Sequence, residues 1–285
     1  MTQYIFVLFM IPVIVSSTPV LAADIVVNED FSKVLRFENP RGERLVIVDN
    51  VFGSIDVKGY DGDEIQVRIR KSITARSDEK VKEAQEEVIL DIFEGAELIE
   101  FYVDGPFRRG GDRGIDWRGY RREGYKVVYD FTLEIPKDCQ IDLKTVDEGD
   151  INVHSIRGDF QASNVNGAIS MKGLRGSGEI SAINGKVLIA FDSNPKNKCK
   201  FETINGDVRL YFQSDLSADF YMKTMNGEVF TDFEVVSLPG RSEMSEKKNG
   251  KSAYKVTHMS GVRAGTGGPE CELHTLNGDM FILSQ

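Results

Sequence analysis

The sequence predicts an all-β fold, a single-stranded parallel β-solenoid that resembles a β-helix and carries one short helix. The first observation is a series of glycines at a constant nine-residue spacing between short alternating apolar runs, at Gly149, Gly158, Gly167, Gly176 and Gly185. The second is a recurring string of a small residue, an apolar residue, Asn and Gly, at Asn166-Gly167, Asn184-Gly185, Asn205-Gly206, Asn226-Gly227 and Asn277-Gly278. Repeats that bury an apolar face only against their neighbours are typical of solenoids.

The third observation concerns the apolar residues that follow these glycines, because equivalent positions form columns across the units. One column contains Ile151, Ile169, Val187, Val208, Val229 and Met280. In stacked parallel units the first five are expected in one buried column, with about 4.8 Å between neighbours. Asn-Gly between alternating runs is also the usual signal of a two-residue hairpin, because both residues tolerate positive φ. An antiparallel β meander is therefore the alternative fold.

Residues 1–23 contain no charged side chain and are predicted to form a signal peptide. The apolar run from Tyr4 to Val15 has the length of a signal-peptide core and is too short to span a bilayer. Leu21-Ala22-Ala23 suits a cleavage site, but Met1-Thr2-Gln3 lacks the usual basic residue, so an uncleaved anchor is the alternative. The chain is therefore expected to be exported to the periplasm, the cell surface or the medium, with no transmembrane span after cleavage.

The charge of the chain limits its classes of partner. It has 45 acidic and 35 basic residues, which gives a net charge of −10. Affinity for nucleic acid or for anionic membranes depends on a surplus of Lys and Arg that neutralises phosphates. No nucleic-acid partner is therefore expected.

Residues 24–285 are expected to form a single elongated β-repeat domain. Its N-terminal part, 24–138, contains alternating strand patterns, turn signals, one short helix and an Arg-Gly loop. The regular repeats occupy 139–285 and lapse in a predicted hairpin insert, 232–270.

The predicted helix runs from Ser77 to Glu87. Ser77 is a suitable N-cap, and Val81, Ala84 and Val88 recur at the spacing of one helical face.

Residues 104–124 differ from the rest because they combine six Arg, six Gly and the single Trp of the chain. Aromatic and Arg side chains often anchor interfaces, so the positions predicted for a partner contact are Trp117, Arg118, Tyr120 and Arg121. The alternative is a polar surface loop without a binding role, whose glycines make ordering costly. Under both interpretations the core does not depend on the segment. Replacing 106–122 with a short linker is therefore expected to leave the melting temperature nearly unchanged.

The sequence predicts no catalytic constellation, no metal site and no cofactor. His154, His258 and His274 are isolated, and no zinc, nucleophile or phosphate-loop motif is present. Single glycines without a doubled-Gly loop leave too few oxygen ligands for a calcium-binding β-roll. The enzyme alternative is a β-helix polysaccharide-active enzyme, which needs carboxylates that converge on adjacent coils. Its candidate carboxylates are Asp142, Asp207 and Glu202.

The three cysteines, Cys139, Cys199 and Cys271, are expected to form no intramolecular disulfide. Cys199 and Cys271 share one register, but coils in sequence order would place the Phe220 coil between them, about 10 Å apart at ~4.8 Å per coil. A disulfide needs Cα atoms within about 7 Å.

The repeat strings resemble those of a bacterial β-strand-repeat family of putative adhesins, a domain of unknown function with Thr-Val-Asn-Gly-Asp-Ile repeats. The likeness covers 45–70, where Asn50-Val51-Phe52-Gly53-Ser54-Ile55-Asp56-Val57 occurs, then 125–136, the units from Ile141, and 265–269 ahead of 275–282. The chain departs from the pattern at Phe52 and Glu148, where Asn is usual, and at Lys186, where an acidic residue is usual. The resemblance implies an exported or envelope-facing β-helical domain with no established ligand.

The expected function is therefore that of an exported, non-catalytic, adhesin-like or envelope interaction module that binds a protein or a surface glycan. Two alternatives remain open at this point. One is a periplasmic sensor or regulatory domain that binds a membrane protein, and the other is the β-helix polysaccharide-active enzyme.

Overall fold

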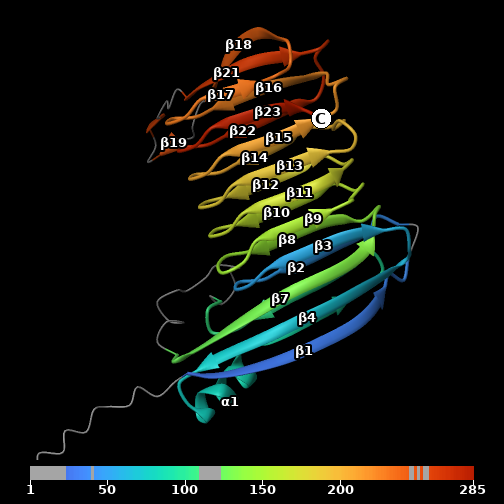
Figure 1. Cartoon of the computed structure of the whole chain (residues 1–285), viewed down its shortest axis with the longest axis vertical. Coiled ribbons are helices and arrows are strands. Elements are labelled where there is room, and N and C mark those ends of the chain that lie inside the picture. The colour runs from blue at the N-terminus through green and yellow to red at the C-terminus, as the bar shows by residue number, and fades with distance from the viewer. Residues whose placement is uncertain (1–23, 40–41, 109–122, 244–246, 249–250, 253–256) are drawn as a thin grey trace, which may run out of the picture.

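The computed structural model describes residues 24–39, 42–108, 123–243, 247–248, 251–252 and 257–285, which form two long sheets (Figure 1). The first sheet has the spatial order β1 (Ile25–Arg36), β4 (Glu64–Ala75), β7 (Tyr125–Pro136), β3 (Ile55–Tyr60), β9 (Ile151–His154), β11 (Ile169–Leu174), β13 (Val187–Phe191), β15 (Val208–Phe212), β23 (Met280–Ser284) and β17 (Val229–Thr231). The second has the order β18 (Val235–Glu243), β21 (Thr257–Ala264), β16 (Ala218–Lys223), β22 (Glu270–His274), β14 (Cys199–Glu202), β12 (Gly178–Ala182), β10 (Phe160–Asn164), β8 (Gln140–Thr145), β2 (Leu45–Asp49), β6 (Leu98–Asp104) and β5 (Ile89–Glu94).

The remaining elements are few. β19 (Lys247–Lys248) and β20 (Lys251–Ser252) pair in a short ribbon, and α1 (Asp78–Glu87) is the one helix in the described part of the chain. The prediction of an all-β fold with one short helix is therefore confirmed.

The repeat units stack in parallel, and each gives one strand to each sheet. β8 leads into β9, β10 into β11, β12 into β13 and β14 into β15, and equivalent strands pair in register. Ile169 pairs with Ile151 on one side and with Val187 on the other, and Val187 pairs with Val208. These four side chains are fully buried. The antiparallel meander is therefore wrong for these units, although antiparallel strands at both ends make the two sheets mixed.

The last unit of the chain is out of sequence order. β22 pairs in parallel with both β14 and β16, and β23 pairs with both β15 and β17. Met280 therefore separates Val208 from Val229 in the predicted column. Val229 is also 40% exposed, because β17 is the edge strand of its sheet, so its predicted place among the buried members is wrong.

The same order corrects the predicted separation of Cys199 and Cys271. Cys199 pairs directly with Cys271 on adjacent parallel strands, and the strand that contains Phe220 lies beyond them. Neighbouring strands lie about 4.8 Å apart, so the two residues are within reach of a disulfide. The reason given above for excluding that disulfide is wrong.

The Asn-Gly turns let neighbouring units approach closely. A Cβ atom on Gly206 would lie 2.2 Å from the carbonyl oxygen of Gly185, and one on Gly185 would lie 1.9 Å from that of Gly167. The hydroxyl of Thr203 donates to the carbonyl of Gly185 at 3.0 Å, and that of Thr275 donates to the carbonyl of Gly206 at 3.2 Å. Glycine thus leaves the space for stacking, and the threonine supplies a donor to a carbonyl at the contact between units.

α1 begins where the sequence predicts it. The hydroxyl of Ser77 accepts the backbone N–H of Lys80 at 3.3 Å, which caps the first turn, and Val81 and Ala84 are buried. The helix packs against the long strands β4 and β7, which extend the first sheet beyond the repeats.

At the opposite end of the molecule, β18 and β21 pair antiparallel and extend the second sheet beyond β16, within the predicted insert 232–270. In the part of the chain that the structure describes, no helix combines the length and the hydropathy that a membrane crossing requires. The predicted signal peptide, 1–23, lies outside the described residues.

Candidate functional site

The turns that connect the second sheet to the first stack into one long edge, which we call the turn edge. It contains the Asn-Gly turns after β10, β12, β14, β22 and β16, in this spatial order. Parallel bridges join Asn184 to Asn205, and Asn277 to both Asn205 and Asn226. Figure 1 shows successive units lying one above the other along the molecule. The structure therefore brings together at this edge the Asn and Gly residues that the sequence predicts for the repeat turns.

The Asn side chains of the turn edge form a hydrogen-bonded ladder. Asn184 donates to the side-chain oxygen of Asn166 at 2.8 Å, and Asn205 donates to that of Asn184 at 2.7 Å. The ladder continues from Asn277 to Asn205 and from Asn226 to Asn277, both at 2.7 Å. These amides are exposed yet bind one another, so they hold the turns at a constant spacing.

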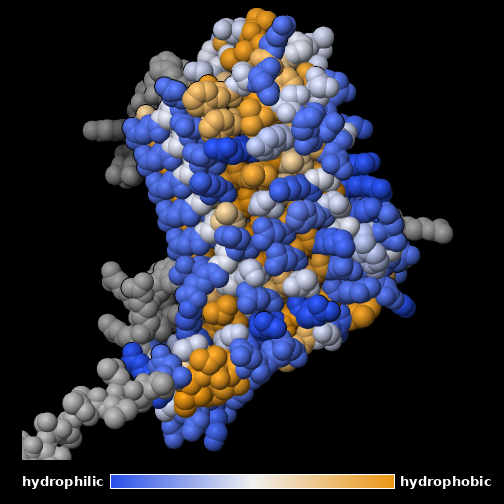
Figure 2. Space-filling view, viewed as in Figure 1, coloured by the Kyte–Doolittle hydropathy of each residue, from blue (hydrophilic) through white to orange (hydrophobic). Residues whose placement is uncertain are grey.

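Beside the ladder lies a series of exposed apolar side chains, which we call the apolar row. It is formed by the residue before each Asn in four successive units, Ile183 (38% exposed), Ile204 (42%), Leu276 (40%) and Met225 (70%). Figure 2 shows a largely hydrophilic face with apolar side chains at the end formed by β16, β17 and β18, along the middle, and in a patch at the opposite end. A contiguous apolar stripe that the core does not use marks a candidate interaction surface.

Charged side chains on the outer face of the second sheet pair with one another close to the turn edge. Glu202 contacts Nδ1 of His274 on the neighbouring strand and Nζ of Lys200, both at 2.9 Å. The hydrogen bond from His274 is the main cause that lowers the pKa of Glu202 to about 2, and Lys200 adds to it. A carboxyl group held ionised in this way is unsuited to donating a proton as a general acid.

The carboxylates named for the enzyme alternative do not converge. Asp142 lies on β8 and Glu202 on β14, with β10 and β12 between them, which is about 14 Å at ~4.8 Å per strand. The paired carboxylates of glycosidases lie roughly 5 to 10 Å apart. Asp207 lies in a turn, where it accepts the backbone N–H of Asp279 at 3.2 Å.

Acidic residues after the repeat glycines act as acceptors between units. Asp150 accepts the backbone N–H of Ala168 at 2.7 Å, and Asp279 accepts that of Glu228 at 2.9 Å. These bonds use carboxylate oxygens that a calcium site would need.

Within the described residues, one group of three acidic side chains is close enough to share a metal ion, Glu83, Glu87 and Glu123. Glu83 already contacts Nζ of Lys80 at 2.5 Å, and Glu87 accepts the hydroxyl of Tyr125.

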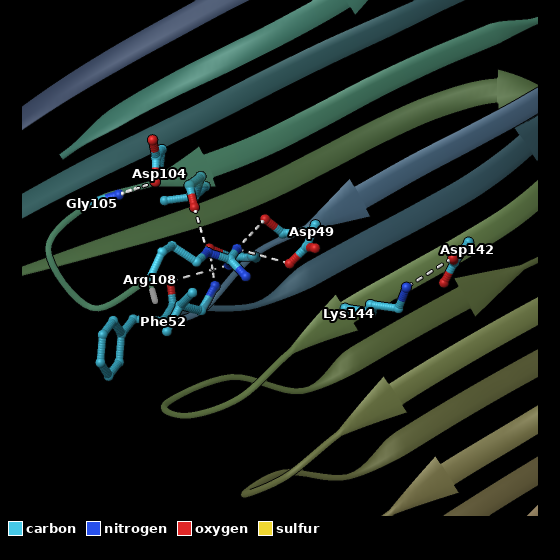
Figure 3. Close-up of polar contacts among 10 residues, drawn as sticks. Asp49, Phe52, Asp104, Gly105, Arg108, Asp142 and Lys144 are labelled. Carbon is cyan, nitrogen blue, oxygen red and sulfur yellow. Dashed lines mark hydrogen bonds and ion pairs between the residues drawn. The ribbon is translucent and has the colours of Figure 1, made fainter. Parts of the chain in front are cut away.

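The Arg-Gly segment starts from a buried anchor beside the turn edge (Figure 3). Nη2 of Arg108 donates to a carboxylate oxygen of Asp49 at 2.8 Å, and Nε donates to the carbonyl of Val103 at 3.1 Å. The guanidinium also lies 4.6 Å from the ring centre of Tyr102. The side chains of Arg108 and Asp49 are only 6% and 4% exposed. A buried ion pair needs such additional contacts to offset its desolvation.

Phe107 completes the anchor. It is buried and packs edge-on against Phe52, with ring centres 5.9 Å apart. Phe52 bridges to Asp147 in the turn after β8, and Val146 of that turn accepts the backbone N–H of Asn166 at 2.8 Å, so the segment departs next to the turn edge. Phe107 and Arg108 belong to the core, so the premise that the core does not depend on residues 106–122 is wrong, and replacing them with a linker is now expected to lower the melting temperature. The predicted contact residues Trp117, Arg118, Tyr120 and Arg121 lie outside the described residues.

Besides Arg108 and its partner Asp49, the structure buries another charged residue that the sequence patterns above do not single out. Lys71 is 5% exposed and lines a cavity of about 460 Å³ between the first sheet and β5. The signal was present in the sequence, because the period-two pattern of β4 puts Lys71 in line with Val67, Ile69 and Ile73.

Comparison with solved structures finds proteins of low sequence identity. A putative cell adhesion protein from Clostridium sporogenes is 11% identical over 91% of this chain and 100% of its own, with a TM-score of 0.38. A putative adhesin from Bacteroides fragilis is 11% identical over 93% of this chain and 99% of its own, with a TM-score of 0.37. A putative lipid binding protein from Parabacteroides distasonis is 9% identical over 91% and 96%, with a TM-score of 0.25. No family model and no curated protein matches the chain.

Proposed function

We propose that this chain is an exported, non-catalytic interaction module of adhesin-like type that binds a protein or a surface glycan along the turn edge. The observation that carries the proposal is the apolar row, because large apolar side chains stay exposed in four successive units. Surface stripes of this kind are typical of binding sites on otherwise polar proteins.

The surroundings of the apolar row favour binding over turnover. The Asn ladder and the in-register strands hold the row rigid, so a partner would lose little free energy in ordering it. The nearby carboxylate of Glu202 is paired with His274 and Lys200 and is kept ionised. A row held in fixed register, beside a carboxylate that is already paired, suits recognition.

The Arg-Gly segment would supply a second contact. Arg108 and Phe107 fix its first residues next to Phe52, at the same edge as the apolar row. Trp117, Arg118, Tyr120 and Arg121 follow within the segment and remain the predicted anchors for a partner.

The test of the turn edge compares three forms of the full chain as baits, the wild type, the double variant Ile204→Ser/Leu276→Ser and the control Leu188→Ser. Leu188 is half-buried on β13, on the outer face of the first sheet, and is not a member of the apolar row. Each bait is incubated with immobilised surface glycans and with native cell envelopes. The adhesin-like function predicts retention of surface material that the double variant loses and the control keeps.

Other outcomes separate the alternatives. Retention of one membrane protein of the same cell, again lost only in the double variant, would favour the sensor or regulatory domain. Shortening of a polysaccharide would show an enzyme. Equal retention by all three baits would refute the turn edge as the binding surface. Recovery of the chain only from the cytoplasm, with residues 1–23 intact, would refute export.

A further inference from the structure

A lysine occupies a core position in β4. The side chains that β4 turns inward are Ile65, Val67, Ile69, Lys71, Ile73 and Ala75. Lys71 is 5% exposed, and burial is the main cause that lowers its pKa below the ordinary value. Lysine is rarely buried to this extent unless it is paired. The partners of its ammonium group therefore decide what the residue does.

The described residues offer Lys71 only a weak set of partners. Nζ donates to the carbonyl oxygen of Val88, the C-cap of α1, at 2.9 Å and lies 5.6 Å from the ring centre of Tyr129. No carboxylate in the described parts of the chain reaches the 4.0 Å limit of an ion pair with Nζ. Glu29, opposite Lys71 on β1, acts on it only at longer range. An ammonium group has three N–H donors. The carbonyl of Val88 accepts one, so two remain for a ligand.

The cavity beside Lys71 is mainly apolar, and its other polar lining residues include Ser32, Gln85 and Lys33, which pairs with Glu94. Its volume is about 460 Å³, and its walls include Val67 and Ile69 of β4 and Leu90 and Ile92 of β5. Phe31 and Ile89 also line it and are 46% and 43% exposed, so apolar surface continues from the cavity to the outside. Small-molecule sites typically have volumes of roughly 300–1,000 Å³ and combine apolar walls with a few polar groups.

We propose that this cavity binds a free acyl carboxylate, with the carboxylate head on the ammonium of Lys71 and the alkyl tail among Val67, Ile69, Leu90 and Ile92. Charge complementarity selects the head, because Lys71 is a buried cation without a carboxylate partner in the described residues. The apolar walls select the tail, since its burial removes alkyl surface from water. The hydroxyl of Tyr129 donates to the carbonyl of Val88, so Tyr129 positions the same acceptor that holds Lys71.

Lys71 also has a structural role, because its cation lies at the C-terminal end of α1, which has no basic residue in its last turn. Loss of stability in a Lys71 variant is therefore no test of the site. The first experiment uses the wild-type full chain and three probes with the same tail, dodecanoate, dodecanol and dodecyltrimethylammonium, each below its micellar concentration. Calorimetry and thermal shift are expected to show dodecanoate binding at least about tenfold tighter than dodecanol, because charge-assisted bonds are the stronger ones. The cationic probe is expected not to bind.

The second experiment uses Lys71→Met and Lys71→Arg, with Lys58→Met as the matched control. Lys58 is exposed on β3 and lies 3.6 Å from Glu134, outside the cavity. Dodecanoate affinity is expected to fall about tenfold or more in Lys71→Met, to persist in part in Lys71→Arg and to be unchanged in Lys58→Met.

Several results would overturn the site. Equal affinity of the wild type for the anionic and cationic probes would do so without any variant. A thermal shift by dodecanoate that persists in folded Lys71→Met would leave Lys71 as a helix-terminal cation only. Binding to phosphatidylglycerol vesicles without binding of dodecanoate would indicate a membrane surface as the ligand, and the proposal of a free acyl carboxylate would be wrong.

Discussion

At the scale of single residues, the repeat glycines are required by the close approach of neighbouring units. A Cβ atom on Gly185 would lie 1.9 Å from the carbonyl oxygen of Gly167, and Gly206 stands in the same relation to Gly185 at 2.2 Å. The opposing atom belongs to the backbone in both cases and cannot rotate away as a side chain would. Space between units therefore explains the glycine column.

Gly185→Ala is expected to lower the free energy of unfolding by about 1–3 kcal/mol or more, because the added methyl group must push two stacked units apart. Urea unfolding measures the loss. Ser181→Ala in the same unit is the control, since Ser181 is exposed on β12 and such changes usually stay within about 0.5 kcal/mol. Equal stability of the two variants would contradict the close-approach explanation.

The contribution of Glu202 to the free energy of unfolding depends on pH. The hydrogen bond from His274 is the main cause that lowers the pKa of Glu202 from its ordinary 4.5 to about 2. A carboxyl group with a lowered pKa stabilises the fold fully above the unfolded value and loses that contribution as pH falls through the folded value. The difference in unfolding free energy between wild type and Glu202→Gln should therefore be largest above pH 4.5 and shrink toward pH 2. Urea titrations across this range measure it, and a difference that grows on acidification would contradict the assignment.

At the scale of elements, the pairing of β14 with β22 places two thiols side by side. Cys199 and Cys271 are both buried, and the hydrogen bond between the thiols lowers the pKa of Cys199. Oxidation would join their sulfurs with loss of two protons and two electrons, while glutathione disulfide is reduced to two glutathione thiols. Such a bond would tie the last unit of the chain to a unit about 70 residues earlier, and closing loops of that size stabilises by about 4 kcal/mol.

Refolding in glutathione disulfide is therefore expected to leave one reactive thiol, that of Cys139, in the denatured protein. Refolding in a reductant should leave all three. Cys199→Ser is expected to show two reactive thiols after either treatment, and Cys139→Ser should show none after oxidation. Three reactive thiols in the oxidised wild type would show that the strand geometry does not permit the bond.

The sequence predicts the repeat strands well, but it does not predict their spatial order in the two sheets. The Asn-Gly strings and the apolar columns depend on contacts between neighbouring units, so their periodicity reveals the parallel stacking. The insertion of β22 and β23 leaves no such mark, because Thr224-Met225-Asn226-Gly227 and Thr275-Leu276-Asn277-Gly278 fit either position equally well. In the candidate sites, the apolar row follows from the same strings. The residue type alone places Lys71 at the surface, whereas the period-two pattern of β4 puts it in phase with the core. Arg108 lies outside the named strands, so no periodicity in the sequence indicates its burial.

At the scale of the whole molecule, the inserted unit constrains how the chain folds. Residues 218–231 are synthesised before 270–284, yet the later segment lies between them and residues 199–212. In repeat proteins a unit is stabilised mainly by its neighbours. Until the last segment arrives, the strands β16 and β17 have equivalent partners available in β14 and β15. Completion of the fold then requires β16 and β17 to separate from β14 and β15 so that β22 and β23 can insert. This insertion forms non-local contacts and is therefore a slow step.

A chain that ends at Gly268 tests this account, because it lacks β22 and β23. We expect it to close the gap, with β16 against β14 in the register that aligns Glu202 with Lys223, since His274 pairs with both in the full chain. Cysteines introduced at these two positions in a Cys199→Ser background should form a disulfide in the truncated chain, where the strands are about 4.8 Å apart. In the full chain β22 separates them by about 10 Å, beyond the reach of a disulfide.

A synthetic peptide of residues 269–285, added before oxidation, should prevent the crosslink by strand addition between β14 and β16. Failure of the truncated chain to crosslink, with proteolysis confined to 199–264, would show instead that these units need the last segment in order to fold.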